Sequence, residues 1–146
     1  MISIIVIPKY FRTFTLIKHI LKPLLMKQET KTLCTFVIAG INYHDAFEVW
    51  NCLMPGTKLK IVRESNNTHD PDAILLTFDW SNPEIGISEE FKIGYVPRYC
   101  NEPVATLIDM GWLDFLECRL TEIDNEPHDN GIHAEIRIRR NLETAL

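Results

Sequence analysis

The stretch that decides the fold is IVRESNNTHDPDAI, residues 61–74, which is followed further along the chain by IGYVPR, residues 93–98. Each motif joins an apolar, strand-like run to a group of polar or turn-forming residues. Asn and Asp side chains bond readily to nearby backbone groups and so build turns between strands. We therefore expect strands that bring polar side chains to one mouth of a small β-barrel, and we expect the functional site at that mouth.

The composition is that of a single globular domain. The chain has 146 residues, of which 46% are hydrophobic and 24% charged, which is enough for one core and short for two. Residues 1–32 hold six basic residues and one acidic residue, so the rest of the chain has nine basic and nineteen acidic residues, an excess of ten negative charges. Broad duplex binding depends on neutralising many phosphates. The acidic body argues against it, but is compatible with a small site that has a few well-placed cations.

The four cysteines (Cys34, Cys52, Cys100 and Cys118) stand singly in the sequence. None has the spacing of a C-x-x-C pair or of a zinc-ligand set. A disulfide framework is not expected without a secretory signal, and isolated cysteines are typically small core residues. We expect a cytoplasmic protein.

Residues 1–31 form an apolar and basic N-terminal extension. Its longest uncharged stretch, residues 1–8, is far shorter than the ~20 residues that span a bilayer, and its charged and apolar parts have the reverse of the signal-peptide order. Three interpretations stay open: a helix packed on the domain, an amphipathic anchor with weak membrane association, or an extension without fixed structure. We expect an amphipathic helix, because one helical face collects the apolar side chains of Phe14, Ile17, Leu21, Leu24 and Leu25.

Periodicity and turn residues divide the rest of the chain into strands and connections. Apolar or alternating runs predict strands at residues 33–41, 58–63, 73–78, 91–96, 113–123 and 132–139. Polar segments predict a loop at 64–72, a hairpin connection at 79–90 and a turn at 125–131, the last because it ends in Asn-Gly. The spacing within residues 42–53 is compatible with a short helix.

A helix is predicted at residues 102–110. Asn101 can cap it, Pro103 suits its first turn, and Gly111 can end it in the left-handed conformation. One helix packed across an opening formed by five or six strands is typical of OB-like and SH3-like barrels. We therefore predict a mainly β fold with one or two short helices, namely a small OB-like or SH3-like β-barrel at residues 32–142 that follows the N-terminal amphipathic extension.

The predicted pairing gathers polar residues at the strand ends: Arg63, Asn66, Asn67, His69, Asp70, Tyr95 and Arg98. Two interpretations remain open on pattern alone. The cluster can bind a ligand, or its Asn and Asp residues can build the turn while the arginines are solvated strand-end charges.

The motifs VRESNNTHDPDAI and KIGYVPR, followed by a helix that closes in Asp109-Met110-Gly111, resemble the HIRAN domain. This module occurs fused to SWI/SNF-type helicase-like ATPases of replication-fork repair, and as small free-standing bacterial and phage proteins. The likeness runs from about Phe36 to about Arg139, and AGINYH at residues 39–44 also fits the opening strand of the family.

The resemblance implies a modified OB-type barrel that grips the 3′ end of single-stranded DNA. Tyr43 would offer an aromatic face to the terminal bases. Asp70 would accept a hydrogen bond from the 3′-hydroxyl and would repel a 3′-phosphate. His69 would stack on the sugar or bond to it.

The remaining implied contacts are to the DNA backbone. Tyr95 and Arg98 would flank it, with Arg98 and Arg63 pairing phosphates, and Asn67 belongs to the same binding loop. Asn42 stands where the DNA-end binders of the family have a basic residue, so one phosphate contact is missing.

Three functions are carried forward. The first is a nucleic-acid-binding module that recognises single-stranded DNA 3′ ends in repair or replication, with a helicase or nuclease as a further partner. The second is a protein-interaction adaptor that does not bind DNA. The third is a zinc-binding, hydrolase-associated module that would use His128 and His133 with His69 and Asp70, although their spacing matches no zinc pattern. The sequence has no phosphate-binding loop of the GxxxxGK[ST] type, so we do not expect ATP hydrolysis by this chain. We also expect no other enzymatic activity, no bound metal and no cofactor.

Overall fold

The structure is a computed structural model in which residue 17 and residues 29–141 are described. Most of the predicted N-terminal helix lies outside these residues. Thr30–Arg139 form one compact unit. Within the described residues, no helix is long and apolar enough to cross a membrane.

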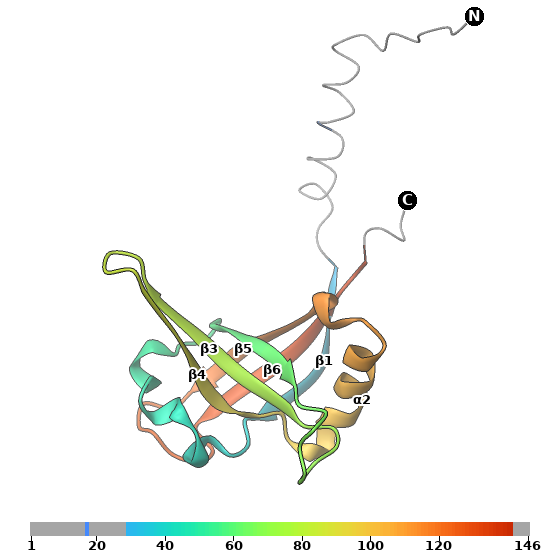
Figure 1. The fold of residues 1–146 in the computed structure, drawn as a ribbon, viewed down its shortest axis with the longest axis horizontal. Coiled ribbons are helices and arrows are strands. Elements are labelled where there is room, and N and C mark those ends of the chain that lie inside the picture. The colour runs from blue at the N-terminus through green and yellow to red at the C-terminus, as the bar shows by residue number, and fades with distance from the viewer. Residues whose placement is uncertain (1–16, 18–28, 142–146) are drawn as a thin grey trace, which may run out of the picture. The chain divides into compact units, whose positions relative to one another are not determined.

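Six antiparallel strands form one sheet in the order β1-β6-β5-β2-β3-β4 (Figure 1). The strands are β1 (Thr30–Val37), β2 (Lys58–Arg63), β3 (Ile74–Asn82), β4 (Ile87–Tyr95), β5 (Leu116–Ile123) and β6 (Ile132–Arg139). The mainly β prediction is confirmed, and each predicted strand has a counterpart. One pattern that carried the prediction is visible in β6, where Ile132, Ala134 and Ile136 are buried and the residues between them are not.

The predicted β-barrel is not closed: the six strands form an open sheet. Among the described residues, its edge strands β1 and β4 meet only through an isolated bridge just after β1, where Ala39 and Tyr95 exchange two backbone hydrogen bonds of 2.9 and 2.8 Å. Gly94 permits this approach, because a Cβ atom there would lie 2.5 Å from the carbonyl oxygen of Ala39 and 2.7 Å from Ile38. The glycine of the IGYVPR motif is therefore needed where the two sheet edges touch.

The hairpin of β3 and β4 is longer than predicted. Residues 79–90 were expected to be a connection, but pairing continues out to Asn82 and Ile87, which leaves only a short turn. The error has a physical reason: beyond Phe78 and Phe91 the paired strands leave the core, so their side chains are mostly polar and resemble a loop in composition. Figure 1 shows this hairpin extending beyond the other strands.

The segment from 41 to 52 forms three short 3-10 turns, η1 (Ile41–Tyr43), η2 (Asp45–Phe47) and η3 (Trp50–Cys52), rather than an α-helix. They bury Ile41, Ala46 and Trp50. The indole N–H of Trp50 donates to the carbonyl of Asp124 at 2.8 Å, which satisfies the one polar group of this buried ring. A further 3-10 turn, η4 (Leu113–Phe115), precedes β5.

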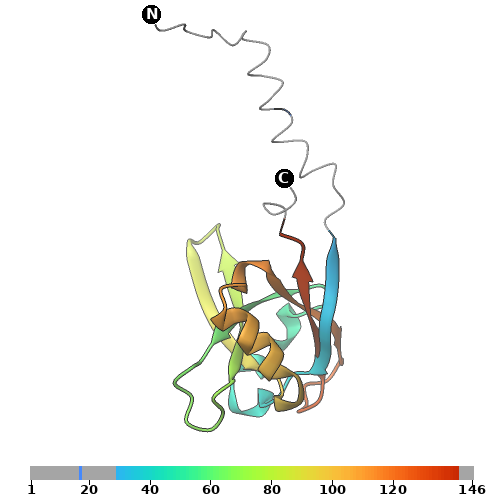
Figure 2. The same ribbon diagram turned by 90° about the vertical axis from the view of Figure 1, so that its right-hand side faces the viewer.

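Helix α2 (Arg98–Asp109) begins four residues before the predicted start. Pro97 precedes it in an extended conformation, with φ of -67° and ψ of 155°. The helix therefore starts at Arg98, the last residue of the IGYVPR motif, and Pro103 lies inside it. Gly111 follows with a φ of +92°, as expected for a residue that ends a helix. In Figure 2 this helix faces the viewer and crosses the strands behind it. The early start matters for function because it places Arg98 and Tyr99 on the first turn of the helix.

Candidate nucleic-acid interface

The loop between β2 and β3 is organised by Asn67. Its side-chain oxygen accepts backbone N–H groups from His69 at 2.9 Å and Asp70 at 3.0 Å. Its side-chain amide donates to the carboxylate of Glu64 at 3.1 Å. Asn67 thus closes the loop by side-chain-to-backbone bonds, and the turn-building interpretation describes its contacts.

Asp70 connects this loop to helix α2. One carboxylate oxygen accepts the backbone N–H of Asp72 at 2.9 Å, and the other accepts the side-chain amide of Asn101 at 2.8 Å. Asn101 is only 3% exposed, and a buried amide without an acceptor would be costly. Two donors therefore fix the position of the Asp70 carboxylate.

Arg98 lies beside Asp70 and stays open to solvent. Its guanidinium donates to the backbone carbonyl of His69 at 2.6 Å, and its Nε is 3.5 Å from the Asp70 carboxylate. The Arg98 side chain nevertheless is 74% exposed. A guanidinium has five N–H donors, so these contacts orient it and leave donors directed at solvent.

Tyr95 joins the loop to the segment that follows β1. Its hydroxyl donates to the Glu64 carboxylate at 2.9 Å, and its ring lies 5.3 Å from the His44 ring. Partial burial, together with the bond to Glu64, raises the pKa of Tyr95, so the phenol remains a neutral donor. Tyr95 therefore bonds to Glu64, and Glu64 bonds to Asn67. Through these two bonds Tyr95 helps to fix the position of the loop.

Arg63 is engaged within the protein. Its guanidinium forms two hydrogen bonds with the carboxylate of Asp109, at 3.0 and 3.1 Å, and approaches the carbonyl of Ala73 at 3.4 Å. The Arg63 side chain is 14% exposed. This two-pronged ion pair joins the end of β2 to the last residue of α2, and it leaves Arg63 poorly placed to meet a phosphate.

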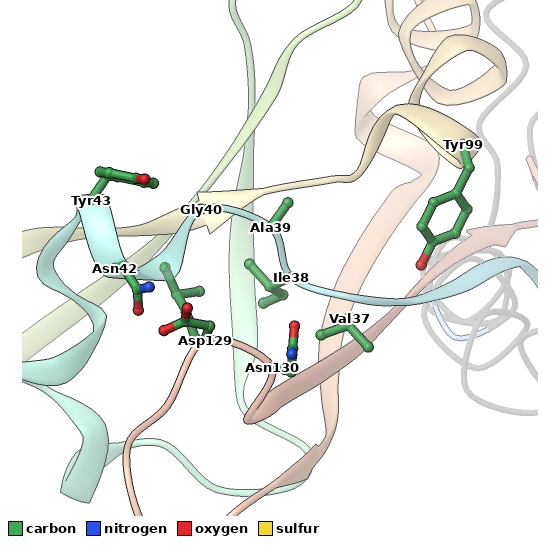
Figure 3. A pocket seen from close by; sticks show the side chains of 10 residues that line it. Val37, Ile38, Ala39, Gly40, Asn42, Tyr43, Tyr99, Asp129 and Asn130 are labelled. Atoms are coloured by element: carbon green, nitrogen blue, oxygen red, sulfur yellow. The ribbon is translucent and has the colours of Figure 1, made fainter.

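Tyr43 borders a separate concavity of about 500 Å³. Figure 3 shows Tyr43 and Tyr99 on opposite sides of it, with Asn42 and Asp129 between them and the backbone of residues 38–40 as one wall. The two tyrosines are 87% and 73% exposed, so both rings are available to a ligand. Tyr99 also borders a smaller hollow of about 250 Å³ over β1 and β6.

The predicted site residues thus form one connected cluster, one internal ion pair and one neighbouring pocket. His69, Asp70 and Arg98 meet directly, and Tyr95 and Asn67 support them through Glu64. The residues that line the Tyr43 pocket include neither Asp70 nor Arg98. Tyr99, the residue after Arg98, lines that pocket.

Residues that sequence reasoning did not select also contribute: Glu64, Tyr99 and Asn101. Glu64 was placed at the start of the predicted loop without a role, and Asn101 was assigned to a helix cap. No local pattern indicates that Glu64 would bond to Tyr95 or that Asn101 would bond to Asp70, because each of these contacts spans 31 residues of sequence.

The described residues contain no group of three or more His, Cys, Asp or Glu side chains positioned to hold a metal ion. His128 pairs with Asp124, and His133 lies in β6. Two of the cysteines approach each other near the start of α2: burial and the neighbouring Cys34 raise the pKa of the Cys100 thiol to about 12. Burial also raises the pKa of Cys118, so these thiols are protonated at neutral pH.

Comparison with known proteins agrees with the geometry of a small, mainly β binding domain. The model of the HIRAN domain family matches residues 31–143. Because the match covers most of the chain, the protein belongs to the HIRAN family, whose members are nucleic-acid-binding modules.

One solved structure is similar over most of its length. It is the crystal structure of a protein from Lactobacillus plantarum, determined as a structural genomics target, with a TM-score of 0.60 and 26% sequence identity. The alignment covers 78% of this chain and 99% of that chain. Comparison with curated proteins produced no match.

Proposed function

We propose that the protein binds the 3′ end of single-stranded DNA, with the terminal nucleotide at Asp70 and Arg98. The observation that carries the proposal is the state of Arg98. Its guanidinium is oriented by the His69 carbonyl and by Asp70, yet its side chain is 74% exposed. A cation that is oriented in advance and still solvated can pair a phosphate without first losing its rotamer freedom.

Asp70 supplies the selectivity for the terminus. Each carboxylate oxygen can accept about two hydrogen bonds, and among the described residues the oxygen that accepts the Asp72 N–H has no second donor. A 3′-hydroxyl can donate to this oxygen. A 3′-phosphate can only place negative charge against it, so a blocked end is rejected.

The pocket between Tyr43 and Tyr99 is suited to the bases that follow the terminus. Stacking on an aromatic ring contributes about 1–3 kcal/mol per base and tolerates any sequence. Asp129 on the pocket lining disfavours phosphate there, which favours a base or sugar. Arg63 is not included among the phosphate contacts, because Asp109 already holds its guanidinium.

The test is fluorescence anisotropy with oligothymidylates that differ only in a 3′-hydroxyl or a 3′-phosphate. We expect the hydroxyl form to bind more tightly. Affinity falls as salt rises, so a plot of log affinity against log salt has a negative slope. Substitution Arg98→Gln should make this slope shallower by about 0.7, the value for one phosphate contact on a single strand.

Lys58→Gln is the matched control for Arg98. Lys58 is exposed and lies at the opposite end of β2 from the loop, about 16 Å from Arg63 at the usual rise per residue. Its removal should leave the salt slope unchanged. Equal binding of both termini would contradict the proposal. Equal effects of the two substitutions would also contradict it, because the oligonucleotide would then be bound by non-specific attraction to positive charge and not by a contact at Arg98.

A further inference from the structure

The outer half of the β3–β4 hairpin is unpaired along both of its edges, the β3 edge and the β4 edge, within the described residues. β2 pairs with β3 only at Thr77 and before, whereas β3 and β4 remain paired out to Asn82 and Ile87. Within residues 29–141, no strand pairs with the outer edge of β4 beyond the bridge at Tyr95. Figure 1 shows the two strands projecting past the rest of the sheet.

The direction of the free backbone groups follows from the contacts of β4. The backbone N–H of Lys92 donates outward, to the carboxylate of Asp45 at 3.0 Å. Because alternate residues of a strand point their N–H groups to the same side, the N–H groups of Glu90 and Ser88 also point outward. Among the described residues, neither of these two N–H groups has a side-chain acceptor of the kind that Asp45 provides for Lys92. These two residues therefore present unpaired donors and acceptors along one edge, as a strand does before another strand is added.

The side chains around this edge combine apolar and acidic character. Ile85 and Ile87 are 62% and 51% exposed. Residues 79–91 contain four acidic residues and no basic residue. Within the part of the chain that the structure describes, the cation that pairs with them is Lys60, whose Nζ lies 3.1 Å from the Glu90 carboxylate. Acidic residues on an edge strand often have no role beyond preventing self-pairing. That role does not account for the two exposed isoleucines at the same tip.

We propose that the edge of β4 at Ser88 and Glu90 binds an extended basic segment of a partner protein, which adds to the sheet as a further strand. The backbone groups supply the pairing, the isoleucines supply apolar contact, and the acidic residues select lysine or arginine over acidic side chains. A second copy of this chain is disfavoured as the occupant, because it would place Glu89 and Glu90 against the same acidic edge. Nucleic acid is disfavoured by the same charge.

This surface is independent of the proposed nucleic-acid site. The hairpin tip lies eight residues along β3 from Ile74, where the binding loop ends, a distance of about 26 Å at the usual rise of a strand. Changes at the tip can therefore be tested without disturbing Asp70 or Arg98.

The test uses a synthetic peptide of alternating lysine and valine, eight residues long, titrated into the full chain and followed by NMR and calorimetry. We expect binding with chemical-shift changes at the amides of Ser88 and Glu90, and none for a peptide in which glutamate replaces lysine. Substitution Ser88→Pro removes one outward donor and should weaken binding at least tenfold. The double substitution Glu84→Lys, Glu89→Lys should reverse the preference between the two peptides.

Ser81→Pro is the matched control. Ser81 lies opposite Ser88 in the hairpin, and its N–H points to the other free edge, so the same chemical change is made on the wrong side. It should leave peptide affinity within about twofold, while thermal unfolding reports that both proline variants are folded. Three results would each overturn the proposal. They are an equal loss of peptide affinity in the two proline variants, no binding of the lysine peptide, and a concentration-dependent dimer that the Ser88 variant abolishes.

Discussion

The hydrogen bond between Asp70 and Asn101 allows a quantitative prediction. Substitution Asn101→Ala removes a donor to a charged acceptor, which costs about 1.5–3 kcal/mol. Substitution Asp70→Ala removes the same bond and leaves a side-chain amide that is 3% exposed without its acceptor, which costs about 1–3 kcal/mol more than an exposed loss. We expect each single change to lower the free energy of unfolding by about 2 kcal/mol, or roughly 6–10 °C in Tm for a domain of this size.

The double variant distinguishes this bond from unrelated effects. Once Asn101 is absent, removal of Asp70 no longer leaves a buried donor without a partner, so the two losses should not add. We expect a coupling free energy of about 1–2 kcal/mol. The measurement is urea unfolding of the parent, both single variants and the double variant, followed by tryptophan fluorescence.

If the losses add within about 0.3 kcal/mol, as they do for distant sites, then Asp70 is not held by Asn101. The selectivity for a 3′-hydroxyl gives an independent readout, because a loosely held Asp70 should discriminate less between hydroxyl and phosphate termini. We expect Asn101→Ala to narrow that difference although it removes no proposed ligand contact.

Three further predictions concern stability and its dependence on pH. Gly94→Ala should destabilise the domain by about 3 kcal/mol, because the new Cβ would lie 2.5 Å from the carbonyl oxygen of Ala39; thermal unfolding measures it. Arg63→Gln should lower the free energy of unfolding by about 1 kcal/mol through loss of the Asp109 pair and should leave oligonucleotide affinity unchanged in the anisotropy assay. Burial raises the pKa of Cys118 above its unfolded value, so the unfolded state loses its thiol proton first and stability should fall as pH rises above ~8.5. Cys118→Ala should reduce the slope of that fall by up to about 1.4 kcal/mol per pH unit, as seen in urea unfolding between pH 8 and 10.5.

Each of these predictions has a control or an outcome that would contradict it. Gly86→Ala changes a turn glycine with nothing within 4 Å of the new Cβ, so its cost should come only from its positive φ and stay near 1 kcal/mol; an equal cost at Gly94 would remove the steric argument. A loss of oligonucleotide affinity in Arg63→Gln would return Arg63 to the set of phosphate contacts. For the thiol, identical slopes in the parent and Cys118→Ala would show that burial of Cys118 does not contribute.

The sequence alone determined the mainly β class, the order of the strands along the chain and the presence of one helix after the second motif. These properties depend on local periodicity and on turn residues, which act over a few positions. The alternation in β6 and the Asn-rich loop are examples, since Asn67 builds its turn from neighbours only two or three residues away. The family likeness also rests on such local motifs, and the matched family model agrees with it.

Only the tertiary structure decided which charged groups are engaged and which are open. Arg63 and Arg98 both follow apolar runs in their motifs, yet Arg63 is held by Asp109 and Arg98 remains largely exposed. The tertiary structure also decided the partner of Asn101, which is Asp70, 31 residues away. It likewise decided that the outer half of the hairpin forms paired strands although no core lies beneath it. The physical reason is that burial and partner choice depend on which elements the whole chain brings into contact, and no local pattern in the sequence encodes those contacts.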